Sequence, residues 1–318
     1  MKNIAVLTSG GDSPGMNACV RAVVRYGISK GLNVYGVQRG YTGLIDGQIK
    51  LLNERSVGNI IQAGGTVLKT SRCPEFMEQE GRLKAIKNLK KHNIEGLVVI
   101  GGDGTFRGAN ELIKEGIICA CVPATIDNNL FYTDYTIGFD TATNTVVNIL
   151  NNIRDTSYSH DRISLVETMG AGCGDIALSA GLAAGADAII VPEIEFNLDD
   201  ICNKLIRAKN HKKEGSIVVV SEHVCDLNEL AKIIQDRCKM ECRVVNLGHI
   251  QRGGSPSAFD RNLATRYGVV AVDEIINGNC GVVGYKNGRY IYISIEKALS
   301  VKQDFNISDY MLAEKLSF

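Results

Sequence analysis

Two aspartates of the chain lie just after short apolar runs, where a carboxylate can take part in phosphoryl transfer. Asp103 lies in GGDGT, after the run at 96–100, and can hold Mg²⁺ against polyphosphate oxygens, because Mg²⁺ usually takes only one or two protein carboxylates. The alternative is that Asp103 caps the next helix. Asp127 lies in VPATIDNNL, and one carboxylate is enough to orient an attacking hydroxyl and accept its proton.

Further polar side chains suit phosphate and sugar groups. Thr125 points to the same side as Asp127 if the segment is extended. Arg72 in TSRCPEF can clamp phosphates, or it can pair with Glu75. The later half of the chain offers arginines that match phosphate bidentately and a Glu that suits sugar hydroxyls, although each can also be a surface ion-pair partner. This second set comprises Arg162, Glu222, Arg243, His249 and Arg252.

Short β-rich apolar runs alternate with stretches of helical spacing, and these elements must position the polar residues. The runs lie at 3–8, 33–37, 96–102, 117–123, 163–167, 187–192 and 216–222. The alternation predicts parallel sheets covered by helices, with ligands beyond the carboxyl ends of the strands. Glycine pairs in the following loops let backbone N–H groups approach a phosphate closely. No GxxxxGK[ST] sequence occurs, so a nucleotide must be held by other means.

The bulk composition narrows the class of protein. A chain of 318 residues with 45% hydrophobic residues fits two packed lobes with a cleft between them. Lys plus Arg and Asp plus Glu both total 35, so no global field draws the protein to nucleic acid or to a membrane. The first apolar run is too short for a membrane span or a signal peptide, and the ten scattered cysteines favour reduced thiols. These features predict a cytoplasmic protein.

Six segments, in order over essentially the whole chain, resemble those of the bacterial ATP-dependent 6-phosphofructokinases. They are SGGDSPGMN, GGDGT, TIDNN, IGFDTA, SHDR and GHIQRGGSPSAFDR. GGDGT alone is also similar to a motif of NAD kinases and diacylglycerol kinases, whereas TIDN and GHIQRGGSP distinguish the family. The resemblance implies ATP-dependent phosphorylation of fructose 6-phosphate to fructose 1,6-bisphosphate in glycolysis.

The resemblance also implies the fold and its division. We expect an α/β protein with two Rossmann-like lobes, each a mainly parallel sheet flanked by helices, and an active site in the cleft between them. Residues 1–138 plus 252–302 would form the ATP-binding lobe. Residues 139–251 plus 303–318 would form the lobe that binds fructose 6-phosphate. The family forms homotetramers whose active sites are completed across an interface, so a homotetramer is expected.

Positions that match the family's motifs carry implied roles. Asp103 would be the Mg²⁺ ligand, and Asp127 would be the base for the sugar 1-hydroxyl with Thr125 beside it. The implied ATP contacts are Gly11, Tyr41, Arg72, Cys73, Gly102, Asp103, Gly104, Thr105 and Gly108. The implied fructose 6-phosphate contacts are Thr125, Asp127, Met169, Glu222, His249 and Arg252 of one subunit, with Arg162 and Arg243 of a neighbour. Pyrophosphate-dependent relatives typically place Asp and Lys where this chain has Gly104 and Ala124, so these small residues favour ATP.

The chain departs from the family's pattern at the centre of the implied site. Asn129 stands where the family has a second Asp, and Ala171 stands where it has an Arg that is expected to neutralise charge on the transferred phosphoryl group. Gly172 replaces the usual His, and Met77 replaces a residue that is often basic. A missing arginine of this kind can cost ~10³ to 10⁵ in rate, although losses within one site need not add. We expect a slow enzyme, unless another Lys or Arg supplies the charge.

The family's bacterial members also bind ADP or phosphoenolpyruvate at an effector site between subunits. The matching positions here are Arg21, Arg25, Arg154, Gly185, Asp187 and Lys213. Asp187 replaces the more usual Glu and His211 replaces an Arg, and either change can weaken or retune the response. Arg21 and Arg25 can also be read as an exposed helix face at spacing i,i+4.

Two other functions stay open on the sequence alone. The first is a regulatory paralogue with little or no activity, which keeps Asp103, Asp127 and the sugar-phosphate arginines but serves to bind metabolites. The second is a kinase for a different phosphorylated sugar, since the fructose-binding set would tolerate close analogues.

Overall fold

The computed structural model describes residues 1–302 and 305–317, which form two compact units. Unit 1 comprises Met1–Ile126, Leu130–Thr141 and Arg252–Lys302. Unit 2 comprises Asp127–Asn129, Ala142–Gln251 and the described residues 305–317. Residues 303, 304 and 318 of the predicted second lobe lie outside the described residues. In the part of the chain that the structure describes, no helix is long and apolar enough to cross a membrane.

Unit 1 is built on a seven-stranded sheet of strand order β11-β10-β5-β4-β1-β2-β3. The five inner strands are parallel to one another, while β3 and β11 pair antiparallel at the two edges. The strands are β1 (Asn3–Thr8), β2 (Asn33–Val37), β3 (Ile49–Leu52), β4 (Gly96–Gly101), β5 (Ile118–Pro123), β10 (Gly281–Lys286) and β11 (Arg289–Ile293).

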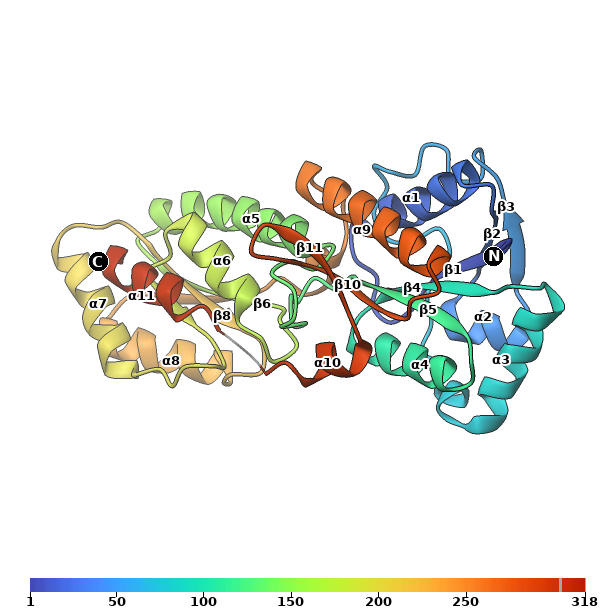
Figure 1. Cartoon of the computed structure of the whole chain (residues 1–318). Coiled ribbons are helices and arrows are strands. Elements are labelled where there is room, and N and C mark those ends of the chain that lie inside the picture. The colour runs from blue at the N-terminus through green and yellow to red at the C-terminus, as the bar shows by residue number, and fades with distance from the viewer. Residues whose placement is uncertain (303–304, 318) are drawn as a thin grey trace. The chain divides into compact units, whose positions relative to one another are not determined.

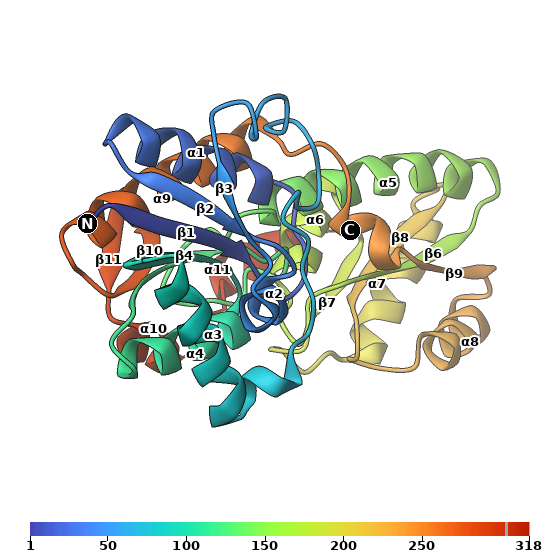
Figure 2. The ribbon, with the colours of Figure 1, turned by 90° about the vertical axis from the view of Figure 1, so that its right-hand side faces the viewer.

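Helices cover both faces of this sheet because its central strands are apolar on both sides. Ile4 and Val6 of β1 pack with α1 and α9, whereas Ala5 and Leu7 pack with the helices of the opposite face. Figures 1 and 2 show α1 and α9 together on one face and α2, α3, α4 and α10 on the other. The helices are α1 (Met16–Ser29), α2 (Gly40–Asp46), α3 (Gln79–Lys91), α4 (Asp103–Lys114), α9 (Ala258–Ile276) and α10 (Ile295–Ser300), with the 3₁₀ turn η1 (Pro74–Met77).

Unit 2 is built on a smaller, parallel sheet of strand order β7-β8-β6-β9. Its core lies where the strands meet α7 and α8, and α6 packs against β6, β7 and β8 with α11 behind it. In Figure 1, α5 and α6 lie across this sheet from α7 and α8. The elements are α5 (Phe139–Ser159), β6 (Ile163–Thr168), α6 (Asp175–Ala184), β7 (Ala188–Ile190), α7 (Leu198–Asn210), β8 (Ser216–Ser221), α8 (Leu227–Cys238), β9 (Cys242–Asn246), η2 (Gly248–Arg252) and α11 (Ile307–Leu316).

The predicted fold class is confirmed, since both units carry mainly parallel sheets flanked by helices. The predicted apolar runs coincide with the seven strands β1, β2, β4, β5, β6, β7 and β8 to within a few residues. The ten cysteines are free thiols in the structure, as the composition predicts.

One buried carboxylate of α9 fixes the path of the chain between β5 and the first turn of α5. Asp260, in the first turn of α9, is fully buried. Its Oδ1 accepts a hydrogen bond from the Gly138 N–H at 2.9 Å, and its Oδ2 accepts one from the Thr141 N–H at 2.8 Å and another from the Thr141 hydroxyl. Three donors therefore converge on a carboxylate that water does not reach, and each would be unsatisfied without it.

We predict that Asp260→Ala lowers the free energy of unfolding by roughly 3 kcal/mol, because it leaves buried N–H and hydroxyl donors unpaired. Urea unfolding followed by circular dichroism measures the change. Asp46→Ala is the control, since Asp46 is an exposed aspartate at the end of α2 and its loss should change stability by no more than about 0.5 kcal/mol. Equal effects of the two substitutions would contradict a role for Asp260 in holding this segment.

The same carboxylate predicts a dependence of stability on pH. Burial raises the pKa of Asp260 from 3.8 to about 6, although the hydrogen bonds from Thr141 and Gly138 act in the opposite direction. Between pH 4 and pH 6 the folded chain keeps this proton while the unfolded chain loses it, so stability falls as the pH rises. Relative to Asp260→Asn, which has no proton to lose, the wild type should lose up to about 3 kcal/mol over this range. Parallel urea titrations at pH 4, 5, 6 and 7 test this, and a constant difference between the two proteins would contradict it.

Candidate active site

The predicted ATP contacts of unit 1 lie beyond the carboxyl ends of its parallel strands. Gly11 follows β1, Tyr41 lies in the helix after β2, and Asp103 begins the helix after β4. Because β2, β1 and β4 are parallel neighbours, their carboxyl ends share one edge of the sheet. The structure therefore brings Gly11, Tyr41 and Asp103 to the same edge of the sheet. The sequence predicts that ligands lie at this edge.

Asp103 stands at the start of α4, where the helix begins without a side-chain cap from Gly102. Free backbone N–H groups and the helix dipole favour a negative group at such a start. A Cβ placed on Gly104 would meet no atom within 4 Å, so the space in front of this turn is open. The turn can thus receive phosphate oxygens, and the Asp103 carboxylate beside it is about half exposed.

These features also fit a magnesium ion. Mg²⁺ needs only one or two protein carboxylates and completes its shell with water and substrate phosphates. Within the described residues no group of three or more His, Cys, Asp or Glu side chains gathers as an all-protein cage would require. Asp103, a single accessible carboxylate beside a turn with room for a phosphate, is the kind of ligand expected of such a site.

The Tyr41 side chain lies against Phe76 and Gly108, two residues that line a pocket of unit 1. Its ring stacks on Phe76 with centroids 4.0 Å apart, and its hydroxyl donates to the Thr105 carbonyl at 2.6 Å. A Cβ on Gly108 would come within 2.8 Å of the Tyr41 ring, so the close approach requires glycine. A pocket of about 440 Å³ lies beside them and is lined by Phe76, Met77, Arg82, Arg107, Gly108, Asn110, Glu111, Lys114 and Leu299.

Two arginines of unit 1 that are predicted site residues differ in their surroundings. Arg252 lies against Gly11, because a Cβ on this glycine would stand 3.1 Å from Arg252 Nη1. A predicted sugar-phosphate contact and a predicted ATP contact are thus neighbours. Arg72 is exposed just before η1, next to the half-buried Cys73, and its suggested partner Glu75 pairs instead with Lys84 at 3.0 Å.

In unit 2, the short segment around Asp127 is buried and held by α6. The side chains of Asp127 and Asn128 are largely buried, and Asn128 has a left-handed backbone with φ of 52°. The Asn128 side-chain amide donates to Asp175 Oδ2 at 2.9 Å, across a sequence separation of 47 residues. Burial raises the pKa of Asp175, and the hydrogen bond from Asn128 acts in the opposite direction. Sequence reasoning missed Asp175, which is the first residue of a helix and carries no signal of this long-range contact.

The loop after β6 is tied down by two side chains from elsewhere in unit 2. The N–H groups of Gly170 and Ala171 both donate to Glu222 Oε1, at 3.1 and 2.9 Å. The Met169 N–H donates to Oε1 of Gln251, at 3.1 Å. Gln251 is fully buried in η2, two residues after His249, and was also missed from the sequence. Predicted contacts Met169, Glu222 and His249 all follow the carboxyl ends of strands, those of β6, β8 and β9.

Arg162 and Arg243 lie at the opposite end of the same strands. Arg162 immediately precedes β6, and Arg243 is the second residue of β9, where it pairs across the sheet with Ser164. The Arg243 guanidinium forms an ion pair with Glu241. Within unit 2 the structure therefore separates these two arginines from the carboxyl-end loops. The prediction that they serve a neighbouring subunit stays a prediction.

The predicted effector residues fall into one set in each unit. In unit 1, Arg21 and Arg25 lie one turn apart on α1. In unit 2, the Arg154 guanidinium donates to the Ala184 and Gly185 carbonyls at the end of α6. Asp187 is buried, pairs with Lys213, and accepts a hydrogen bond from the Ile217 N–H at 2.9 Å.

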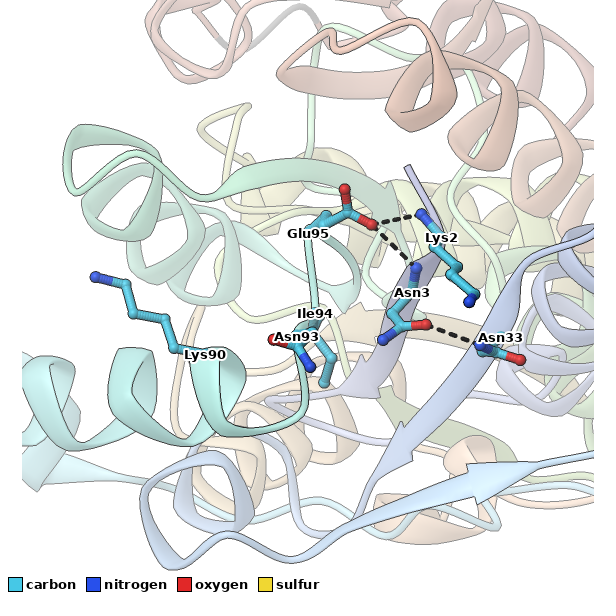
Figure 3. Close-up of a pocket in the computed structure, with 7 residues that line it drawn as sticks. All are labelled: Lys2, Asn3, Asn33, Lys90, Asn93, Ile94 and Glu95. Carbon is cyan, nitrogen blue, oxygen red and sulfur yellow. Dashed lines mark hydrogen bonds between the residues drawn. The ribbon is translucent and has the colours of Figure 1, made fainter.

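A second hollow lies at the other end of the unit 1 strands (Figure 3). Lys2, Asn3, Asn33, Lys90, Asn93, Ile94 and Glu95 line it. Glu95 accepts hydrogen bonds from the Lys2 and Asn3 N–H groups, and the Asn33 amide donates to Asn3 Oδ1 at 2.9 Å. Its lining residues are at the amino ends of β1, β2 and β4 and in the last turn of α3, and none of them is a predicted site residue.

The chain is similar to known phosphofructokinases over its whole length. The family model described as phosphofructokinase matches residues 3–275. The ATP-dependent 6-phosphofructokinase of Clostridium botulinum (strain Alaska E43 / Type E3) is 52% identical over 319 residues, which cover 100% of both chains. That of Clostridium botulinum (strain Hall) is 54% identical over 318 residues, again covering 100% of both. The phosphofructokinase structure from Saccharomyces cerevisiae superposes with a TM-score of 0.87 at 35% identity, covering 94% of this chain and 45% of the yeast chain. With a family match over most of its length and relatives above 50% identity, this chain belongs to the phosphofructokinase family of phosphotransferases.

Proposed function

We propose that this protein transfers the γ-phosphoryl group of ATP to the 1-hydroxyl of fructose 6-phosphate, as a cytoplasmic, Mg²⁺-dependent enzyme of glycolysis. The observation that carries the proposal is the placement of Asp103, an accessible carboxylate at the uncapped start of α4, beside an open turn at Gly104. Relatives that align over the whole chain at 52% and 54% identity are ATP-dependent 6-phosphofructokinases. The small Gly104 and Ala124 leave room for a nucleotide.

Unit 1 would bind the nucleotide. Gly11, Gly102, Gly104 and Thr105 would offer backbone and hydroxyl groups to the phosphates, and Arg72 would add a charge. The pocket beside Tyr41 and Gly108, about 440 Å³ with an apolar Phe76 and Met77 on its wall, has room for the base. Asp103 would hold Mg²⁺, which neutralises charge on the polyphosphate when it is bound.

Asp127 would orient the sugar hydroxyl and accept its proton, with Thr125 hydrogen-bonding the substrate. The contact between Asn128 and Asp175 supports this role, because it fixes the backbone on which Asp127 stands. A base must lie within hydrogen-bond reach of the proton it takes, and a misplacement of about 1 Å can cost ~10² in rate. We therefore assign Asp175 a positioning role.

Unit 2 would bind the sugar phosphate through its carboxyl-end loops. Met169, Glu222 and His249 would contact the sugar, together with Arg252, while Arg162 and Arg243 would serve the site of a neighbouring subunit. The position of these two arginines at the amino ends of β6 and β9 supports that division, because they are far along the strands from the other contacts of their own sheet. Such a division needs more than one subunit, and we propose a homotetramer. ADP or phosphoenolpyruvate would act as effector through Arg21, Arg25, Arg154, Gly185, Asp187 and Lys213.

A catalytically weak regulatory paralogue is the second candidate, and Asn129 with Ala171 is the observation that favours it. Both positions lack the charge that phosphoryl transfer uses in the family, while the surrounding framework is intact. A kinase for another sugar phosphate remains the third. A steady-state assay of ADP release with Mg²⁺, ATP and fructose 6-phosphate, with pyrophosphate as the parallel donor, decides among them. Turnover within ~1 to 10³ per second supports the kinase. Substrate binding without turnover would support the regulatory protein.

We predict that Asn129→Asp combined with Ala171→Arg raises kcat at least about tenfold, because both changes restore charge around the transferred group. Position 171 already carries a Cβ at φ of 50°, so an arginine adds no new backbone strain there. The matched control is Asn129→Asp with Ala171→Gln, which places an uncharged side chain on the same backbone. An increase in both variants, or in neither, would show that a positive charge at 171 does not limit the rate.

We predict that Asp175→Ala lowers kcat by about 10-fold to 100-fold with little change in the KM for ATP, because the Asn128 amide loses its acceptor and Asp127 is no longer held. Asp175→Asn, which keeps an acceptor oxygen, should retain most of the activity. Asp200→Ala is the control, since Asp200 is an exposed aspartate in the first turn of another helix of unit 2. Equal losses in the Asn and Ala variants would refute a positioning role through Asn128.

A further inference from the structure

The structure places an unassigned arginine directly on the carboxylate that is proposed to hold the metal. Arg107 Nε donates to Asp103 Oδ2 at 2.9 Å, and its Nη2 reaches Asp103 Oδ1 at 3.3 Å. The two residues are one turn apart on α4, so the contact lies within unit 1 and within one helix. The hydrogen bond and charge of Asp103 raise the pKa of Arg107, which stays a cation.

This ion pair is easily exchanged. The Arg107 side chain is 63% exposed and that of Asp103 is 48% exposed. Exposed pairs at i,i+4 stabilise a helix by only about 0.3 to 0.5 kcal/mol. A charge-assisted hydrogen bond from a guanidinium to a phosphate is worth several times more, and guanidinium binds phosphate in the same forked geometry as carboxylate. A nucleotide phosphate is therefore the stronger partner for Arg107 once a metal takes Asp103.

A second observation places Arg107 at the pocket that is proposed to bind the base of the nucleotide. Its side chain lines the pocket of about 440 Å³ that also contains Gly108 and Phe76. Arg107 thus borders the proposed base pocket and contacts Asp103 at the start of the helix. A guanidinium within hydrogen-bond distance of the carboxylate that would hold the metal would also be within reach of a polyphosphate bound at the same helix start.

We propose that Arg107 is a nucleotide-binding residue that exchanges Asp103 for the polyphosphate: it pairs with Asp103 when the site is empty and binds the phosphates when ATP is present. The inference rests on the proposed ATP site at Asp103 and goes beyond it by assigning the cation.

The test is the affinity for nucleotides without sugar phosphate, measured by calorimetry on the full-length protein. With Mg²⁺ present, Arg107→Gln should weaken ATP binding about 10-fold to 100-fold, as expected for one charge-assisted hydrogen-bonding group. AMP binding should be nearly unchanged, because AMP lacks the β- and γ-phosphates. Arg107→Lys, which keeps the charge and loses the fork, should fall between Arg107→Gln and the wild type.

Lys84→Gln is the matched control, because Lys84 forms an exposed i,i+4 pair with Glu80 on α3, outside the pocket lining. It should bind ATP as the wild type does. Unchanged or tighter ATP binding by Arg107→Gln would overturn the inference, and would mean that Arg107 only stabilises the helix or only competes with Mg²⁺. Wild-type protein that binds no ATP would instead refute the proposed function itself, so the two failures are distinguishable.

Discussion

The burial of the central strands of unit 1 on both faces is the constraint on which the candidate nucleotide site depends. Alternate residues of β1, β4 and β5 enter two separate apolar cores, so neither face of the sheet is available to a polar ligand. Hydrophobic burial, at about 25 cal/mol per Å² of apolar surface, fixes these strands far more strongly than any single loop contact does. Chemistry is thereby restricted to the strand ends, where Gly11, Asp103 and Thr125 emerge at a common edge.

Much of this framework could be predicted from the sequence, because local apolar runs and helical spacing are sufficient to define strands buried on both faces. β3, β9, β10 and β11 were not among the predicted runs. β3 and β11 are antiparallel edge strands, and their residues are mostly exposed or half-buried, so their apolar pattern is weak. β9 is likewise exposed or half-buried along its length. β10 is apolar in part, but GVVGYK is broken by glycines.

The candidate site could be predicted only where the type of a residue and its local sequence were enough to indicate its chemistry. Asp103 and Asp127 stood out because each carboxylate follows an apolar run. Three other residues did not stand out, because their significance lies in their contacts. Asp175 accepts from an amide 47 residues away, and Gln251 accepts from an N–H 82 residues away. Arg107 donates to the carboxylate one turn earlier. The first two contacts depend on tertiary folding. The third was visible as i,i+4 spacing, but such pairs are common on helix surfaces and carry no functional signal alone.

The loop at Gly170 and Ala171 has a consequence for engineering. Its two N–H groups are held by the Glu222 carboxylate, and Ala171 keeps a side chain in a left-handed backbone conformation. The Glu222 and Gln251 side chains hold this loop through its backbone N–H groups, and neither contact uses the side chain of residue 171. Residue 171 can therefore be replaced by side chains of different charge and length while the loop keeps its conformation. A set of variants at residue 171 would vary the charge available to phosphoryl transfer while the rest of the protein stays constant.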